Sequence, residues 1–306
     1  MIRLPTVFLE GNKLPRVILS IRPPSSRGLQ EISSLMRRAY EGGAWCFDLP
    51  TSRHHQSFKE LNELTEDTSL IGLAHVGAEE GVSLSGIPLR RVESKVSATV
   101  MKHLFAPDLV RTLKEMGVWK SPSFFPSSDS LEVLTQKDID RMSFDSSRFD
   151  RALSPFEPKT SPFLIMGGRY GDWLLGLGRA DLLKKMVSTI REKGFIPILS
   201  GQWATFFLPK AKPLNAAAYA IPINKKRSFF DLGQASELIK RFDKPVISLN
   251  PFGDKELLTA PEEALSFLLD ELKVYLAIAE VSSEEEGERI LKAAENIPSL
   301  RPHRKA

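Results

Sequence analysis

Histidine and aspartate residues that could perform chemistry gather in the first third of the chain. Asp48 and His75 each end a short apolar run, and His54 and His55 follow Asp48 closely. If the two runs are neighbouring parallel strands, Asp48, His75 and one of the other histidines converge at one edge. Asp48, His75 and His54 are therefore candidate catalytic acid–base residues. Together with His55 they are also candidate ligands of a divalent metal, and the alternative is that they are ordinary polar loop residues.

Further polar residues follow other apolar runs. Arg22 and Arg169 carry positive charge suited to an anionic or carbonyl-bearing small molecule, so they are candidate substrate-binding residues. Tyr170 is a candidate proton donor beside Arg169. The glycines at 167–168 would allow the backbone to approach a ligand closely, or would simply make a tight turn.

Eight apolar runs rich in β-branched residues alternate with helical stretches. These runs cover 17–21, 44–48, 69–75, 162–166, 195–199, 217–221, 245–249 and 274–278. Their continuous apolar character is typical of strands buried on both faces of a parallel sheet. Apolar residues spaced about 3.6 apart predict helices over 29–40, 180–193 and 261–272, and a serine cap followed by acidic residues predicts one over 283–296.

Eight strand–helix units predict a (β/α)₈ TIM barrel of the α/β class. The alternative is an open, doubly wound sheet, but the turn after the first run lacks the Gly-x-Gly-x-x-Gly pattern. The third and fourth runs begin about 93 residues apart, whereas the others are about 22 to 32 apart. We therefore predict a single domain over 1–306 with a long insertion at 76–160. This insertion is either a surface elaboration or a lid over the barrel face where catalysis takes place.

The insertion has its own predicted elements. Residues 95–104 favour a strand, and 108–116 favour a helix. The segments 121–128 and 154–158 are rich in serine and proline, which is typical of loops.

Four segments, in order, resemble the aldo-keto reductase family. They are 29–48, which ends in Phe-Asp, 194–200, which is similar to the family's strand before a Gly-x-Ser, 244–253 with Ser-Leu-Asn-Pro-Phe-Gly, and 261–296 with its late Glu-Asn. The resemblance covers about 220 residues and leaves out the insertion. It implies a barrel that reduces carbonyl compounds with NADP or NAD.

The resemblance also implies a catalytic set of tyrosine, lysine, aspartate and histidine, of which this chain matches one member. Asp48 matches the aspartate, but no tyrosine occurs in 49–55. His75 stands where the family has its lysine, and the glycines at 167–168 stand where it has its histidine. Tyr170 is the phenol that could serve instead.

The same resemblance implies a nicotinamide cofactor against the rim of the barrel. The cofactor-binding candidates are Ser200, Gln202, Asn250, Ser282 and Ser283. Residues 280–296 contain six acidic and two basic residues, a charge that opposes a phosphate at this place. The free N–H groups of a helix starting at Ser283 would attract one, and the acidic residues would also satisfy that helix dipole.

Composition and charge limit the remaining classes. Charged residues of mixed sign make up 26% of the chain and the net charge is +4, which does not favour a nucleic-acid partner despite a basic stretch at 209–230. No apolar run is long enough to cross a membrane, and the single cysteine, Cys46, predicts a core residue and no disulfide. We expect a cytoplasmic protein with a small-molecule ligand at the C-terminal barrel rim.

Three functions remain open on these grounds. The first is a divergent oxidoreductase of the aldo-keto reductase type. The second is a barrel enzyme that uses Asp48 and the rim histidines for metal or acid–base chemistry. The third is a barrel that binds a ligand without catalysis.

Overall fold

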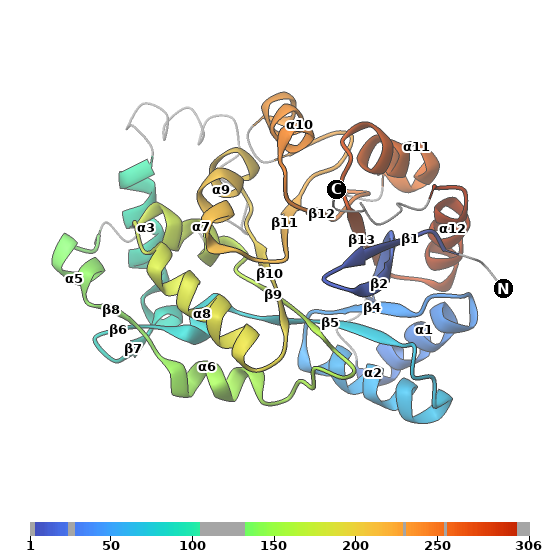
Figure 1. The fold of residues 1–306 in the computed structure, drawn as a ribbon, viewed down its shortest axis with the longest axis horizontal. Helices are drawn as coiled ribbons and strands as arrows, with labels where there is room; N and C mark the ends of the chain where they lie inside the picture. The colour runs from blue at the N-terminus through green and yellow to red at the C-terminus, as the bar shows by residue number, and fades with distance from the viewer. Residues whose placement is uncertain (1–3, 24–27, 105–131, 229–230, 254–255, 299–306) are drawn as a thin grey trace.

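A closed barrel of eight parallel strands forms the centre of the molecule (Figure 1). The structure is a computed structural model that describes residues 4–23, 28–104, 132–228, 231–253 and 256–298. The barrel strands are β3 (Val17–Ile21), β4 (Cys46–Leu49), β5 (Ile71–Val76), β9 (Phe163–Met166), β10 (Ile196–Ser200), β11 (Ala218–Pro222), β12 (Val246–Leu249) and β13 (Leu276–Val281). Each predicted apolar run forms one strand, and β13 pairs with β3 to close the ring. The predicted (β/α)₈ barrel is confirmed.

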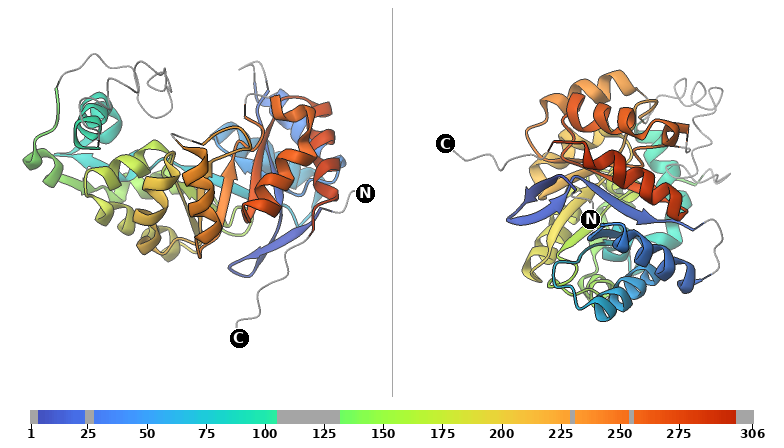
Figure 2. Two further views of the ribbon diagram at one scale, coloured as in Figure 1. Left: turned by 90° about the horizontal axis from the view of Figure 1, so that it is seen from above. Right: turned by 90° about the vertical axis from the view of Figure 1, so that its right-hand side faces the viewer.

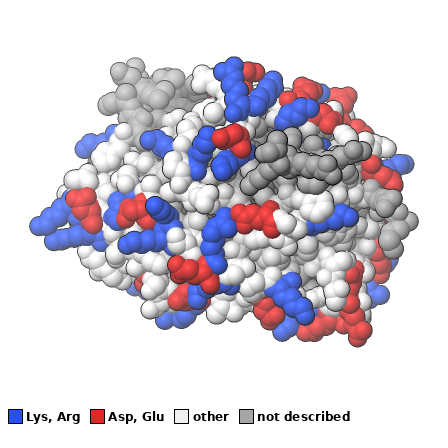
Figure 3. Space-filling view, viewed as in Figure 1, with Lys and Arg blue, Asp and Glu red and all other residues white. Residues whose placement is uncertain are grey.

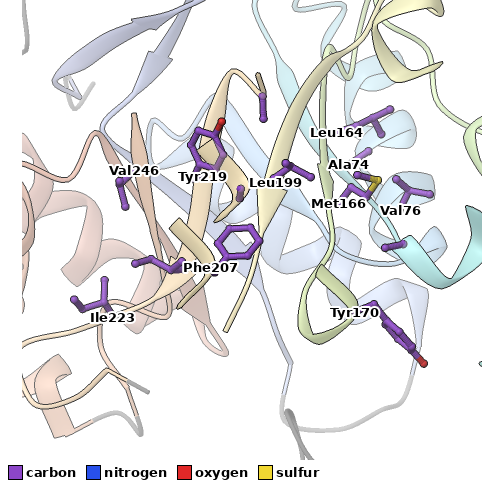
Figure 4. Packing of buried hydrophobic residues seen from close by; sticks show 14 of the residues in the cluster. Ala74, Val76, Leu164, Met166, Tyr170, Leu199, Phe207, Tyr219, Ile223 and Val246 are labelled. Atoms are coloured by element: carbon purple, nitrogen blue, oxygen red, sulfur yellow. The ribbon is translucent and has the colours of Figure 1, made fainter. Parts of the chain in front are cut away.

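The strands alternate between a barrel interior and an outer layer beneath the helices. One apolar cluster takes residues from all eight strands, among them Ile18, Cys46, Leu73 and Ile165, and therefore fills the interior. The residues between them, such as Phe47, join the outer cluster. Figure 4 shows part of this outer cluster around Leu199, Phe207 and Tyr219. Cys46 is fully buried in the interior, as predicted.

Helices surround the barrel in Figure 2. They are α1 (Leu29–Glu41), α2 (Ser52–Thr65), α6 (Ser146–Leu153), α7 (Arg169–Gly176), α8 (Ala180–Glu192), α9 (Ala204–Ala211), α10 (Leu232–Arg241), α11 (Pro261–Ser266) and α12 (Glu284–Glu295), with short turns η4 (Lys212–Leu214), η5 (Glu256–Thr259) and η6 (Phe267–Glu271). The helices predicted at 29–40, 180–193, 261–272 and 283–296 correspond to α1, α8, α11 with η6, and α12. Ser283 accepts a hydrogen bond from Glu286 N and caps α12, as its sequence predicts.

A two-stranded hairpin closes the end of the barrel at which the parallel strands begin. Strands β1 (Thr6–Leu9) and β2 (Asn12–Pro15) pair antiparallel, and Val7, Leu9 and Leu14 extend the interior cluster. Tyr275, just before β13, donates a hydrogen bond to Phe8 O and ties the hairpin to the start of that strand. The opposite end, where the strands finish, is the end at which barrel enzymes carry their active sites.

The segment between β5 and β9 contains η1 (Ala78–Gly81), β6 (Val82–Leu84), β7 (Ile87–Pro88), η2 (Leu89–Val92), α3 (Glu93–Leu104), α5 (Gln136–Asp140), β8 (Met142–Phe144) and α6. The strand predicted at 95–104 is wrong, because this segment is helix α3. Val96 and Val100 are buried at helical spacing, and Thr99 donates to Lys95 O. The helix predicted at 108–116 and the loop at 121–128 lie outside the described residues.

The last part of this segment belongs to the helix layer of the barrel. Asp150 of α6 forms an ion pair with Lys193 after α8 at 3.0 Å. Phe156, after α6, packs edge-on against His55 of α2. Helix α6 is thus linked to α8, the residues after it contact α2, and α3 packs against α7. In Figure 1 the described part of the segment lies at the end of the molecule away from α1 and α12.

The surface carries charges of both signs. Figure 3 shows lysine and arginine interspersed with aspartate and glutamate on the face it displays. Within the basic stretch, Lys212 pairs with Asp243, Lys225 with Glu263, and Lys226 with Glu256. These lysines therefore do not form an unbalanced positive surface. No helix in the described part of the chain is long and apolar enough to span a membrane.

Candidate active site at the barrel mouth

Three side chains from adjacent strands form a hydrogen-bonded chain at the mouth of the barrel. His75 Nε2 lies 2.5 Å from Asp48 Oδ1, and Ser20 Oγ donates to Asp48 Oδ2 at 2.7 Å. Asp48 is 3% exposed, whereas the His75 side chain is 28% exposed. The strand ends therefore bring Asp48 and His75 together as the sequence predicts, with Asp48 buried and His75 accessible.

Strand alternation explains why these three meet. Ser20 follows the interior residue Ile18 by two positions, and its backbone is level with Asp48 in the β3–β4 pairing. Asp48 and His75 likewise stand two residues beyond Cys46 and Leu73, which fill the interior. A polar layer thus sits directly above the apolar interior layer. Ser20 is a residue that the sequence analysis missed, although its position two residues before Arg22 marks the same inward face.

The charge on Asp48 is preserved in spite of its burial. Burial acts to raise the pKa of Asp48, but the charge and hydrogen bond of His75, the Ser20 hydroxyl and the charge of Arg22 together lower it below its ordinary value. An ionised carboxylate accepts hydrogen bonds only, so His75 must carry its proton on Nε2. Nδ1 of His75 is then the ring atom that accepts or delivers a proton.

Arg22 extends this polar layer. Its Nε lies 3.5 Å from Glu280 Oε1, and both side chains are about half exposed. Glu280 is level with Ser20 in the β13–β3 pairing, so the ion pair stands beside the Ser20–Asp48–His75 chain. Arg22 also acts electrostatically on Asp48. The mouth therefore combines the Asp48–His75 pair with the Arg22–Glu280 ion pair.

The other two candidate histidines, His54 and His55, do not join Asp48 and His75. His54 Nε2 bonds to Ile21 O at 2.6 Å, and its Nδ1 bonds to Thr51 Oγ1 at 2.7 Å. Burial, together with the charges of Arg22 and His75, lowers the pKa of His54, which keeps it neutral. Both ring nitrogens of His54 are occupied, so it neither binds metal nor reaches the acid–base pair.

The predicted metal site is therefore wrong in this arrangement. Besides the commitments of His54, the ring of His55 packs against Phe156 on the outer side of α2. Among the described residues, no three histidine, cysteine, aspartate or glutamate side chains are grouped to hold a metal ion. The strand ends align the backbone of the predicted ligands, but the helix that follows β4 turns two of them away.

No family model and no curated protein matches the sequence. Solved structures do match. The aldo-keto reductase AKR11C1 from Bacillus halodurans, in its holo form, superposes with a TM-score of 0.58 at 11% identity, over 97% of this chain and 93% of that one. The chain has the fold of the aldo-keto reductases.

The structure of an aldo-keto reductase from Brucella melitensis is also similar to this chain. It has a TM-score of 0.52 at 11% identity, and the match covers 98% of this chain and 96% of that one. The aldo-keto reductase fold suggested by the four sequence segments is confirmed. At this identity the likeness concerns the fold, so the activity has to be argued from the site.

On this aldo-keto reductase fold, Tyr170 is not placed as a proton donor for the acid–base pair. Burial and the charges of Glu79 and Glu93 raise the pKa of Tyr170. Its ring packs edge-on against Trp173 in the outer apolar cluster, and Figure 4 shows it there. A raised pKa keeps the phenol protonated but makes it a weak acid, opposite to what proton donation requires.

Arg169 contacts the same side chains as Tyr170, namely Glu93 and Trp173. It forms an ion pair with Glu93 of α3 and lies over the rings of Tyr170 and Trp173, 5.4 Å and 5.5 Å from their centres. The insertion thus supplies the carboxylate that holds Arg169. Arg169 therefore connects α3 to α7, whereas Arg22 lies at the barrel mouth.

Two of the cofactor-binding candidates are tied into the backbone of the barrel rim. Ser200 Oγ accepts from Gly168 N at 2.7 Å and donates to Met166 O at 3.2 Å. Gln202 N donates to Asp172 Oδ2 at 2.5 Å. Gly167 has a φ of 125°, and a Cβ there would clash with Ser200 O, which explains the glycine. These contacts stabilise the turn after β9. The glycines at 167–168 therefore make a tight turn, one of the two roles expected for them.

The other three cofactor candidates lie after β12 and β13. Asn250 accepts at its backbone oxygen from Asn224 Nδ2. Ser282 donates from both N and Oγ to Glu286 Oε2 at 2.7 Å, and Ser283 caps α12. The hollow between α12 and α1 has a volume of about 10 Å³ and is bordered by Glu284. The described residues at α12 therefore do not fit a cofactor phosphate, since acidic side chains already occupy the helix start.

Asp172 is a buried carboxyl that the sequence analysis did not single out. It is fully buried, and burial raises the pKa of Asp172 to about 7, although Gln202 N and Trp203 N both donate to it. In the unfolded chain the carboxyl has its ordinary value of 3.8. Between pH 4 and pH 7 the folded state thus keeps a proton that the unfolded state loses, so stability falls as the pH rises.

We expect Asp172→Asn to remove this pH dependence. The difference in free energy of unfolding between variant and wild type should shift in favour of the variant by about 1.4 kcal/mol per pH unit between pH 4 and pH 7. Urea unfolding at pH 4.5, 5.5 and 6.5 measures it. Parallel stability curves for the two proteins would contradict the raised pKa.

Proposed function

We propose that the protein is an enzyme that transfers a proton to or from a small carbonyl compound at the barrel mouth, with His75 as the acid–base group. The observation that carries the proposal is the chain from Ser20 through buried Asp48 to accessible His75. A buried carboxylate that orients an accessible imidazole is the usual arrangement for general acid–base catalysis.

Each residue has a distinct part in this reaction. His75 Nδ1 removes a proton from the carbon next to the carbonyl group. Asp48 fixes the His75 tautomer through Nε2 and stabilises the imidazolium that forms, while Ser20 holds the second oxygen of Asp48. The positive charge of Arg22 stabilises the negative charge that develops on the substrate oxygen. His75 then returns the proton to carbon.

Hydrogen exchange tests this proposal whatever product the reaction forms. The protein is incubated in D₂O with pyruvate, hydroxypyruvate or dihydroxyacetone phosphate, and proton NMR follows the C–H signal beside the carbonyl. We expect at least one compound to lose that signal faster than in a protein-free sample. Rates equal to the protein-free sample for all three would overturn the proposal and favour a barrel that binds without catalysis.

A second candidate is carbonyl reduction with NADPH or NADH. It is favoured by the fold shared with AKR11C1 and by His75, which stands beside Asp48 where the family resemblance places a lysine. The acidic start of α12 does not favour it. Titration with each cofactor, followed by tryptophan fluorescence, decides between the two candidates. Saturable quenching would support the reductase, and unchanged fluorescence would leave proton transfer.

The small-molecule ligand at the barrel mouth and the cytoplasmic location both remain part of this proposal. The mouth carries the polar side chains of Ser20, Asp48 and His75 and lies opposite the hairpin, which suits a small polar compound. The interspersed surface charges of Figure 3 do not suggest a nucleic-acid partner.

A further inference from the structure

A cleft of about 400 Å³ opens beside the barrel mouth, between the end of β3 and the first turns of α1 and α2. Its described lining residues are Ile21, Arg22, Pro23, Gly28, Ile32, Thr51, Ser52, Arg53 and His54. The size suits a small organic molecule. Arg22 belongs both to this cleft and to the mouth, where it acts on Asp48, so the two spaces adjoin.

The cleft is positively charged. Arg22 and Arg53 both line it, and among its described lining residues none is acidic. Glu280, which pairs with Arg22 at 3.5 Å, stands outside the lining. A guanidinium group carries planar N–H donors whose geometry matches a carboxylate or phosphate group. The charge of the cleft therefore selects for an anion.

The first turn of α2 adds to this positive character. Thr51 holds the position before the helix, where a threonine hydroxyl normally accepts from the first-turn N–H groups. Here the hydroxyl bonds to His54 Nδ1 instead, and no described side chain caps the helix. His54 Nε2 donates to Ile21 O, so neutral His54 needs the Thr51 proton at Nδ1. The first turn of α2 also contains no acidic residue.

We propose that this cleft binds the anionic group, a carboxylate or a phosphate, of the molecule that reacts at His75. Arg22 and Arg53 neutralise the anion, and the uncapped first turn of α2 faces it. His54, held by Ile21 and Thr51, fixes the start of α2 against β3 and so sets the distance between the two arginines. That the bound molecule reacts at His75 rests on the proposed function, whereas binding of the anion can be measured by itself.

Isothermal titration calorimetry at low ionic strength with inorganic phosphate and with malonate tests the cleft. We expect saturable binding of at least one, and the tighter of the two identifies the group as phosphate or carboxylate. Arg53→Gln and Arg22→Gln should each weaken that binding about tenfold or more. Arg53→Lys should keep part of it, because charge remains but the planar donors are lost.

Arg241→Gln is the matched control. It removes the same charge from the end of α10, where Arg241 pairs only with nearby Glu237 among the described contacts. We expect its affinity to equal that of the wild type, and thermal unfolding checks that all variants are folded. Equal affinity in Arg53→Gln and Arg241→Gln, or no saturable binding of either anion, would overturn the proposal. Absence of hydrogen exchange alone would overturn the proposed reaction and leave the anion site standing.

Discussion

Replacing His75 with glutamine is expected to lower the rate of hydrogen exchange by about 10²- to 10⁴-fold, the usual contribution of a general acid–base group. Glutamine keeps a donor toward Asp48 but lacks an atom that takes up a proton near neutral pH. Asp48→Asn should cause a loss of similar order, because an amide favours the wrong tautomer of His75. Rates measured by NMR in D₂O under one set of conditions provide the comparison.

Two further variants make this experiment specific. Ser20→Ala removes only the hydrogen bond to the second oxygen of Asp48, so we expect a smaller loss of about tenfold. His55→Gln is the control, since His55 packs against Phe156 away from the pair and its loss should leave the rate unchanged. A His75→Gln protein as active as His55→Gln would show that the proton is transferred elsewhere.

The second large effect is expected on stability. Arg16 is 1% exposed and lies directly before β3, at the end of the barrel where the strands begin. Its guanidinium donates to the backbone oxygens of Leu269, Val274 and Pro298 at 3.1 Å. Arg16→Met fills a similar volume but leaves three carbonyl groups without this partner, of which those of Leu269 and Val274 are buried. Because each buried carbonyl group left unpaired costs about 1–3 kcal/mol, the free energy of unfolding should fall by about 2 kcal/mol or more. Urea denaturation measures the change.

Conservative and distant replacements separate hydrogen bonding from charge. Arg16→Lys keeps the positive charge but cannot reach three carbonyl oxygens with a planar fork, so it should recover only part of the loss. Arg37→Met is the control, because Arg37 is exposed and pairs with Glu41 on the surface of α1. We expect it to change stability by less than about 0.5 kcal/mol. Equal losses in Arg16→Met and Arg37→Met would contradict the role given to Arg16.

The strands were the most predictable part of this fold. Buried parallel strands need apolar residues on both faces, and such runs are visible in any sequence. Segment 95–104 was wrongly predicted as a strand because that prediction also depended on local residue types. Its β-branched valines and threonine favour a strand locally, but packing of Val96 and Val100 on one face favours helix α3.

The site was predictable only as far as the strand ends determine it. Asp48 and His75 could be paired from sequence because neighbouring parallel strands bring their ends together. The side-chain directions of His54 and His55 could not be predicted. They depend on how α2 packs against β3 and on which backbone oxygen each ring nitrogen contacts. Arg53 was not predicted as a binding residue for the same reason, since its place in the cleft depends on how α2 packs.

The sequence by itself determined the barrel, its eight strands, the length of the segment between β5 and β9 and the position of Asp48. These follow from hydrophobic period and spacing, which are local properties of the chain. Only the tertiary structure decided that Ser20, Asp48 and His75 form one hydrogen-bonded chain, that Arg169 pairs with Glu93 of α3, and that Arg22 and Arg53 share a cleft. Those facts depend on side-chain directions and burial, which arise when distant segments pack together.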